Sequence, residues 1–124
     1  PTLLRRQRQM CIRDRSLGGL LVAISKMCIK GNKGIKINKS KNLINEIEYF
    51  FAEDQGRYLI EVNKEDLKEV TKILNKNSVH HEELGIITQN DMIINEKTKV
   101  TIDELKSYYT NWLTKYMSKK WQWI

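Results

Sequence analysis

The chain has 124 residues and a mass of 14.7 kDa, which is the size of a single domain. It is 40% apolar and 30% charged, its net charge is +7, and no apolar run reaches the roughly 18 residues of a membrane span. Two cysteines, Cys11 and Cys28, are too few for a disulfide scaffold or a four-cysteine metal site, so we expect a cytoplasmic protein.

The positive charge is concentrated at the N-terminus. Five of the six arginines lie in the first 15 residues: Arg5, Arg6, Arg8, Arg13 and Arg15. The remaining 109 residues contain a single arginine, Arg57, and are rich in Lys, Asn and Ile. Without residues 1–15, which hold five basic residues and one acidic residue, the net charge falls from +7 to +3. The argument for a nucleic-acid partner therefore weakens once this segment is set aside.

Residues 1–15 differ in composition from the rest of the chain. The stretch Met10–Asp14 resembles a translation of the transposon mosaic end used to prepare sequencing libraries, whose bases ATG TGT ATA AGA GAC AG encode Met-Cys-Ile-Arg-Asp. A basic arm for nucleic acid and a targeting peptide are the alternatives. We predict that residues 1–15 are a non-native leader that packs against nothing, and that the gene itself enters near Gly18.

The first half of the remaining chain predicts two helices and two strands. A helix over residues 20–30 follows a glycine turn and is stopped by Gly31 and Asn32. Its inward side chains are Leu20, Leu21, Ile24, Met27 and Cys28. Residues 34–38 alternate as a strand does, and residues 57–62 are apolar enough for a central strand. Between them Asn42 caps a second helix. Its expected buried face is Leu43, Ile47, Phe50 and Phe51.

The second half predicts a helix, two short strands and a long final helix. Asn63 caps the first helix, with Asp66 at the third position. Its expected inner positions are Leu67, Val70, Ile73 and Leu74. Strands follow over residues 84–87 and 92–94, and Thr101 to Glu104 form a capping box. Six apolar residues of the final helix are assigned to the core: Leu105, Tyr108, Tyr109, Trp112, Leu113 and Tyr116. The order indicates an α/β (α+β) fold, a mixed sheet with packed helices.

Gly18 and Gly19 are the first candidate binding residues. Glycines let a backbone approach a ligand closely, and the following helix presents free N–H groups at its start. Together they suit a phosphate. The alternative is a plain tight turn, and a lone pair of glycines is weak support for a binding site.

Residues 53–57 are the second candidate cluster: Glu53, Asp54, Gln55, Gly56 and Arg57. Adjacent carboxylates suit a metal ion or acid–base chemistry, whereas the simpler interpretation is a solvated turn in which Arg57 pairs locally. His80 and His81 lack a third ligand and are expected at the surface. Cys28 is expected to be a packed thiol. No catalytic residue and no metal ligand are assigned.

Three segments resemble phosphoribosylformylglycinamidine synthase subunit II, a family of the AIR-synthase-related superfamily. Residues 16–25, SLGGLLVAIS, resemble its SDGGL-x-VA-[LI]-[AS] segment, with Leu17 in the place of the family's Asp. Residues 51–62, FAEDQGRYLIEV, resemble its F-[GA]-EDQGRYL-[IV]-EV stretch, and residues 102–117 resemble its C-terminal end. The resemblance covers residues 16–117 and leaves 118–124 as a tail of unknown role. It implies a partial AIR-synthase-like C-terminal domain.

The resemblance also implies an activity. The family is an ATP-dependent C–N ligase of purine biosynthesis that converts formylglycinamide ribonucleotide to the amidine with Mg-ATP and ammonia, beside a glutaminase subunit and a small accessory subunit. This chain resembles only its last part, and the nucleotide, magnesium and catalytic-base positions lie mostly upstream. We therefore expect the fragment alone to be inactive, without a cofactor and without a nucleic-acid or membrane partner. The alternatives are a small basic nucleic-acid-binding module and a structural remnant.

Overall fold

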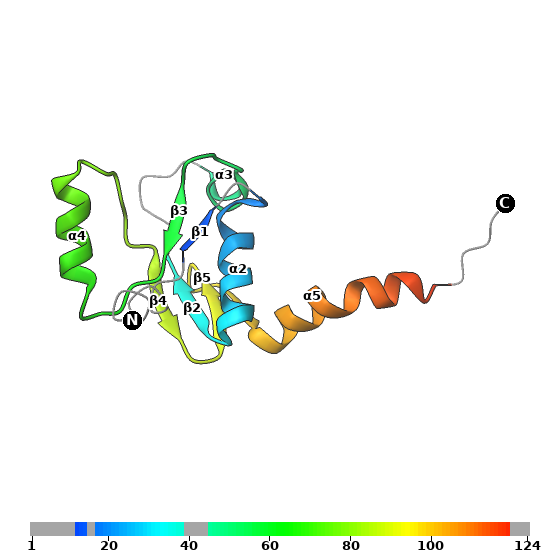
Figure 1. Cartoon of the computed structure of the whole chain (residues 1–124). Helices are drawn as coiled ribbons and strands as arrows, with labels where there is room; N and C mark the ends of the chain where they lie inside the picture. The colour runs from blue at the N-terminus through cyan, green and yellow to red at the C-terminus, as the bar shows by residue number, and fades with distance from the viewer. Residues whose placement is uncertain (1–11, 15–16, 39–44, 120–124) are drawn as a thin grey trace, which may run out of the picture. The chain divides into compact units, whose positions relative to one another are not determined.

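The computed structural model describes residues 12–14, 17–38 and 45–119 (Figure 1). The chain divides into two compact units. Unit 1 comprises Pro1–Met27 and Ser40–Leu84, and unit 2 comprises Cys28–Lys39 and Gly85–Ile124. Helices and a mixed four-stranded sheet confirm the predicted α/β fold class.

Unit 1 contains a two-stranded antiparallel sheet and parts or all of three helices. Strand β1 (Ile12–Asp14) pairs with β3 (Tyr58–Ile60), so that Arg13 lies opposite Leu59 (Figure 1). Helix α2 (Gly19–Gly31) begins in this unit, which also holds α3 (Glu46–Phe51) and α4 (Leu67–Lys76). In the described part of this unit, the buried apolar side chains are Leu20, Ala23, Ile24, Tyr49, Phe50 and Leu59.

The pairing of β1 corrects the expectation that residues 1–15 pack against nothing. Residues 12–14 form a ladder with β3. Main-chain pairing depends on backbone N–H and C=O groups that every residue other than proline carries, so an arginine-rich segment can still extend a sheet. Residues 1–11 and 15 lie outside the described residues, and the origin of this segment stays a prediction.

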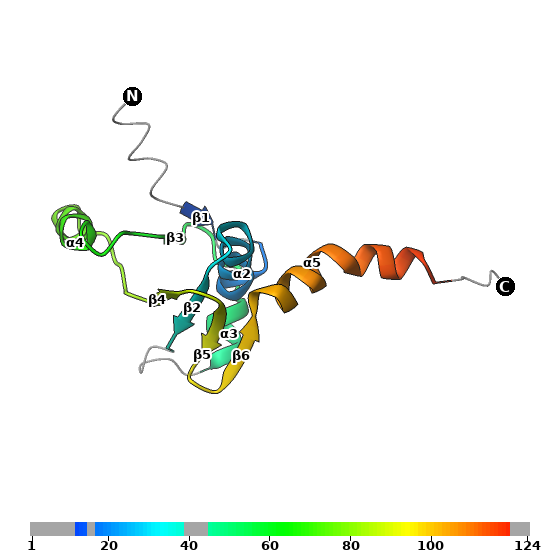
Figure 2. The ribbon, with the colours of Figure 1, turned by 90° about the horizontal axis from the view of Figure 1, so that it is seen from below.

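Unit 2 is built on a four-stranded sheet in the order β4-β2-β5-β6 (Figure 2). Its strands are β2 (Gly34–Ile37), β4 (Gly85–Thr88), β5 (Asp91–Ile94) and β6 (Thr98–Thr101). Strand β2 runs antiparallel to β4 and parallel to β5, whereas β5 and β6 form an antiparallel hairpin. The sheet is therefore mixed, as the sequence predicts. Its buried side chains include Ile37 from β2 and Met92 from β5.

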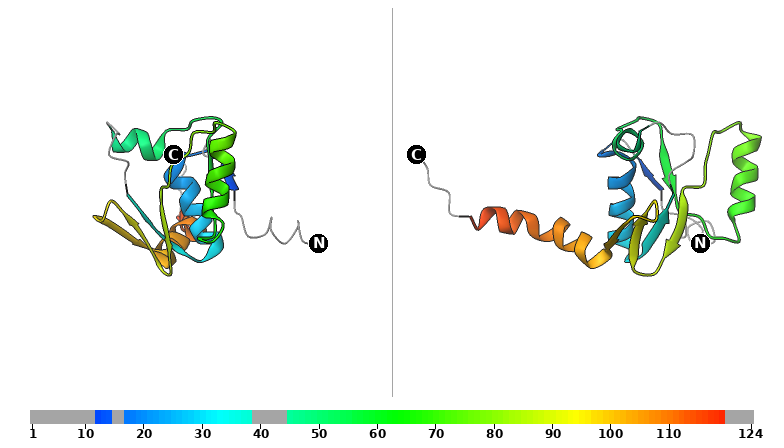
Figure 3. Two further views of the ribbon diagram at one scale, coloured as in Figure 1. Left: turned by 90° about the vertical axis from the view of Figure 1, so that its left-hand side faces the viewer. Right: turned by 180° about the vertical axis from the view of Figure 1, so that it is seen from behind.

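The hairpin of β5 and β6 turns without glycine (Figure 3). Asn95 and Glu96 both have positive φ, 51° and 59°, and the Lys97 amide donates to the Ile94 carbonyl at 3.1 Å. Two central residues with positive φ define the turn whose twist matches a hairpin. A Lys99–Asp91 ion pair at 3.0 Å joins its strands. Strand β6 was not among the predicted strands.

Helix α2 agrees with the prediction, whereas α3 differs in its start and its buried face. Leu20, Ile24 and Cys28 of α2 are buried as expected, whereas the predicted inward residues Leu21 and Met27 are half-buried. Helix α3 is capped by Asn45, whose side chain accepts a hydrogen bond from the Ile47 amide at 3.0 Å. The predicted cap Asn42 and the predicted core residue Leu43 lie outside the described residues. Tyr49 and Phe50 are buried, and their rings meet edge to face at 5.1 Å. The predicted core residues Ile47 and Phe51 are exposed.

Helix α4 has no buried residue among its ten. Its predicted inner positions are exposed at Leu67 and Ile73 and half-buried at Val70 and Leu74. The helix begins later than predicted, because Asp66 occupies the cap position and the Asp66 amide donates to the Asn63 carbonyl instead. The helical period is correct, but a period identifies only an apolar face, and the described residues leave this face exposed or half-buried.

Helix α5 (Ile102–Met117) begins at the predicted cap, where the Thr101 hydroxyl accepts a hydrogen bond from the Glu104 amide at 3.2 Å. Its predicted core assignment is wrong. Only Ile102 is buried, Leu105 is half-buried, and the remaining predicted core positions are exposed: Tyr108, Tyr109, Trp112, Leu113 and Tyr116. Within unit 2 the helix contacts the sheet near its start, through β6. The rest of the helix therefore keeps its apolar face free of the sheet.

Candidate functional site

The glycine turn before α2 adopts the geometry that only glycine accepts readily. Gly18 and Gly19 have φ values of +80° and +76°, in the left-handed region. A Cβ on Gly19 would lie 2.6 Å from the carbonyl carbon of Phe51, at the end of α3. The close approach of two backbones, rather than a ligand, therefore accounts for glycine at position 19.

The glycine turn is hydrogen-bonded to the second candidate cluster, residues 53–57. The Gly18 amide donates a hydrogen bond to Oε1 of Glu53 at 2.8 Å, across 35 residues of sequence. Sequence reasoning treated these as separate candidates, and the structure brings Gly18 and Glu53 together. A carboxylate at the start of a helix is favoured by the helix dipole and by the free amides there. Glu53 thus accepts the hydrogen bond of the Gly18 amide, which the sequence predicted to be available to a phosphate.

The rest of the second cluster is a solvated turn. Arg57 Nη1 lies 3.2 Å from Asp54 Oδ2, which confirms the predicted local pairing. Gln55 and Gly56 are exposed, and Gly56 has a φ of +72° with open space around it. An ion pair this exposed contributes about 0–1 kcal/mol. The structure therefore separates Glu53, which reaches the glycine turn, from Asp54 and Arg57, which pair with each other.

The remaining candidates take structural positions. Cys28 is buried, as predicted for a packed thiol. His80 and His81 are exposed, as predicted, and His81 Nδ1 lies 2.9 Å from the Val79 carbonyl oxygen. The neighbouring Glu82 accepts a hydrogen bond from the Tyr49 hydroxyl at 3.1 Å. Among residues 12–14, 17–38 and 45–119 there is no group of three or more His, Cys, Asp or Glu side chains able to hold a metal ion.

The Gly18 amide already donates its hydrogen bond to a carboxylate. A phosphate at the Gly18 amide would meet the Glu53 carboxylate, which already accepts from that amide. Two anions sharing one donor repel each other, so the arrangement favours the internal carboxylate over an added phosphate. The geometry indicates a structural contact that fixes the start of α2 against the segment after α3.

In the described part of the chain, no helix is long and apolar enough to cross a membrane.

Comparison with known proteins gives a consistent picture. Residues 3–95 match the family described as AIR synthase related protein, C-terminal domain. Phosphoribosylformylglycinamidine synthase subunit PurL of Pelagibacter ubique is 59% identical over 104 residues, which cover 84% of this chain and 14% of that protein. PurL of Bartonella henselae is 34% identical over 106 residues (86% and 14%), and PurL of Rhodopseudomonas palustris strain HaA2 is 32% identical over 109 residues (88% and 15%).

These matches confirm the resemblance that the sequence motifs indicate. The chain spans about one seventh of the length of the curated relatives it matches. A match of 104 residues that starts at residue 1 or later reaches at least Glu104, which lies beyond the end of the family match at residue 95. Strand β6 and the start of α5 therefore belong to the region shared with PurL.

Proposed function

The chain belongs to the family of AIR synthase related protein, C-terminal domains, and from this premise we propose that it serves as part of a formylglycinamidine ribonucleotide synthase. The observation that carries the proposal is the 59% identity to PurL of Pelagibacter ubique over 104 residues. The proposed reaction converts formylglycinamide ribonucleotide to its amidine. ATP would transfer its γ-phosphoryl group to the amide oxygen and leave as ADP, ammonia would then displace the phosphate, and magnesium would hold the nucleotide.

In this proposal the chain's own residues support the catalytic machinery rather than provide it. The Gly18–Glu53 hydrogen bond and the approach of Gly19 to Phe51 hold the start of α2 in place. The nucleotide, magnesium and catalytic base belong to the rest of a full-length synthase. A glutaminase subunit supplies ammonia, and a small accessory subunit completes the assembly. The 124-residue chain alone is then inactive and binds Mg-ATP weakly.

A chimaeric enzyme tests the proposal. Residues 17–117 of this chain replace the matching segment of Pelagibacter ubique PurL, with Leu17 in one version and Leu17→Asp in a second. Formation of the amidine is measured with ATP, magnesium and ammonia. We expect activity to return when Asp stands at position 17. A chimaera that folds but makes no amidine in either version contradicts the proposal.

The isolated chain provides the matched control. Calorimetry with Mg-ATP should detect no tight binding, because a single phosphate contact supplies only part of a ligand's binding energy. Micromolar binding would mean that a complete nucleotide site lies within this chain, which contradicts the upstream placement of the chemistry.

The nucleic-acid-binding alternative gains no support from the site. Lys36, Lys99 and Arg57 are each within 3.2 Å of a carboxylate, on Glu96, Asp91 and Asp54. Cations that already have anionic neighbours contribute less to a phosphate-binding surface. A salt titration of binding to duplex DNA would detect such an activity as a steep loss of affinity with salt.

A further inference from the structure

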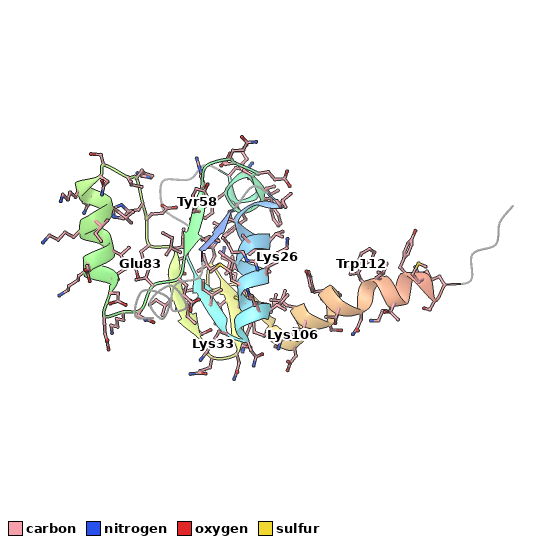
Figure 4. All side chains as sticks on the ribbon, in the orientation of Figure 1. Lys26, Lys33, Tyr58, Glu83, Lys106 and Trp112 are labelled. Atoms are coloured by element: carbon pink, nitrogen blue, oxygen red, sulfur yellow. The ribbon has the colours of Figure 1, made fainter. Side chains whose placement is uncertain are left out.

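Helix α5 presents an apolar face that is exposed beyond its first turn among the described residues. Six of its large side chains are between 47% and 70% exposed: Tyr108, Tyr109, Trp112, Leu113, Tyr116 and Met117. Figure 4 shows Trp112 near the middle of α5, farther along the helix than Lys106. Ile102 is buried, and Lys106 donates to the Asn32 side chain at 2.6 Å, so the helix is anchored at its start. An apolar stripe of this size is typical of an interaction surface.

The centre of this face has the spacing of a helix-pairing seam. Leu105, Tyr109, Trp112 and Tyr116 follow one another at intervals of four, three and four residues. Intervals that alternate between three and four average 3.5 residues, the period at which one helix packs along another. The Trp112 and Tyr116 rings already lie 6.2 Å apart, so the seam is continuous across its second half.

We propose that α5 binds a second copy of this chain, with the two α5 helices antiparallel about a twofold axis between Thr110 and Asn111. The intervals of the seam read the same in both directions. Reversal about this axis therefore places Leu105 opposite Tyr116 of the other copy, and Tyr109 opposite Trp112. A surface that matches itself after a twofold rotation is what an isologous dimer requires.

The charges on α5 favour this direction. The first turn carries Asp103 and Glu104, and the last turn carries Lys115. Glu104 and Lys115 are eleven residues apart, about three helical turns, so they lie on one flank of the helix. Antiparallel pairing brings Glu104 of one copy within about 3 Å, along the axis, of the level of Lys115 on the other. Parallel pairing would set Glu104 three helical turns from Lys115 of the other copy, so these two opposite charges would not meet.

The area also suffices for an interface. An aromatic side chain buries about 150–250 Å² when fully covered, so six half-exposed side chains offer on the order of 700 Å² per chain. Two copies would then bury about 1,400 Å², within the range of specific protein–protein interfaces. This inference does not depend on the proposed synthase activity, because it uses only the surface of α5.

Sedimentation of the 124-residue chain tests the dimer. The measurement covers about a hundredfold range of concentration, with reductant present to keep Cys11 and Cys28 from cross-linking copies. We expect a species of twice the 14.7 kDa chain mass that dissociates on dilution. Trp112→Glu should raise the dissociation constant at least about tenfold, because it places a charge at the centre of the seam. Ile73→Glu, at an exposed apolar position of α4, is the matched control and should leave the dimer intact.

A charge exchange tests the direction. Glu104→Lys alone and Lys115→Glu alone should each weaken the dimer, and the two changes in one chain should restore it, because antiparallel copies then regain both opposite-charge contacts. Circular dichroism confirms that each variant keeps its helix content. A chain that stays monomeric throughout overturns the proposal and leaves α5 to the remainder of a full-length synthase. Equal weakening by Trp112→Glu and Ile73→Glu, or no restoration by the double exchange, also overturns it.

Discussion

Replacing Gly19 with alanine should destabilise unit 1 far more than the loss of a flexible residue would suggest. Gly19 opens α2 with a φ of +76°, and an alanine Cβ there would lie 2.6–2.8 Å from three backbone atoms of Phe51. Real Cβ atoms do not approach heavy atoms so closely. Because the neighbour is main chain, no change of rotamer relieves the contact, and α2 and the end of α3 must move apart.

The size of the effect follows from two contributions. A left-handed conformation costs an L-residue roughly 1–2 kcal/mol. Overpacking against a rigid neighbour costs about 1–3 kcal/mol more, whereas the stiffer unfolded chain returns about 0.4–1 kcal/mol. We expect Gly19→Ala to lower the free energy of unfolding by about 2–4 kcal/mol.

Gly56→Ala measures the first contribution without the second. Gly56 lies in the same unit with a nearly equal φ of +72°, but an added Cβ there meets nothing within 4 Å. It should therefore cost only about 1 kcal/mol, the conformational part alone. Urea unfolding followed by circular dichroism measures both variants against the parent chain. Equal losses at the two positions would refute the argument that the approach of α2 to Phe51 requires glycine.

Three further outcomes test other contacts by the same measurement. Glu53→Ala should cost about 1 kcal/mol through loss of the hydrogen bond to the turn, whereas Glu53→Gln keeps an acceptor and should cost less; equal effects would deny that bond a role. Trp112→Ala should cost under about 1 kcal/mol at low protein concentration, while Ile102→Ala, at a 4% exposed position, should cost about 2–4 kcal/mol, and the reverse order would place Trp112 in the core. Thr101→Ala should cost about 1 kcal/mol through loss of the helix cap and Thr101→Ser should not, so a stable Ala variant would contradict the cap.

Local signals predict much of the fold because they act over a few residues. Gly31 and Asn32 were predicted to stop α2, and the helix ends there, with Asn32 at a φ of 51°. The threonine that caps α5 also acts within one helical turn, as predicted. Strand β6 was missed because its turn uses Asn95 and Glu96 at positive φ in place of the glycine that usually marks a hairpin. Strand β1 was missed because its backbone pairing leaves no apolar pattern in the sequence.

The sequence predicted the buried residues less well, because helical periodicity does not show which surface packs against an apolar face. The stripe on α5 has the spacing expected of a core helix, and its tyrosines and tryptophan are nonetheless exposed. The pattern of an amphipathic helix indicates only that its apolar face is covered in the functional state. The same domain, the rest of a longer protein or another copy can provide that cover. The helical period is the same in all three cases, so the proposal of a second copy depends on the reversible spacing and the end charges of α5.

In the candidate site, too, local sequence patterns predict the separate motifs but not the contact between them. The sequence singled out the Gly18 turn and the Glu53 cluster separately, because nothing in a local pattern reports a contact across 35 residues. In the structure two of the three segments that carry the family resemblance form one contact. A substitution at Gly18 or Glu53 should then act first on the stability of the turn, and only through it on any reaction. In a chimaeric synthase, the activity lost on Glu53→Ala should therefore follow the fraction of unfolded protein. Loss of turnover in a variant as stable as its parent would instead show that the carboxylate takes part in the chemistry.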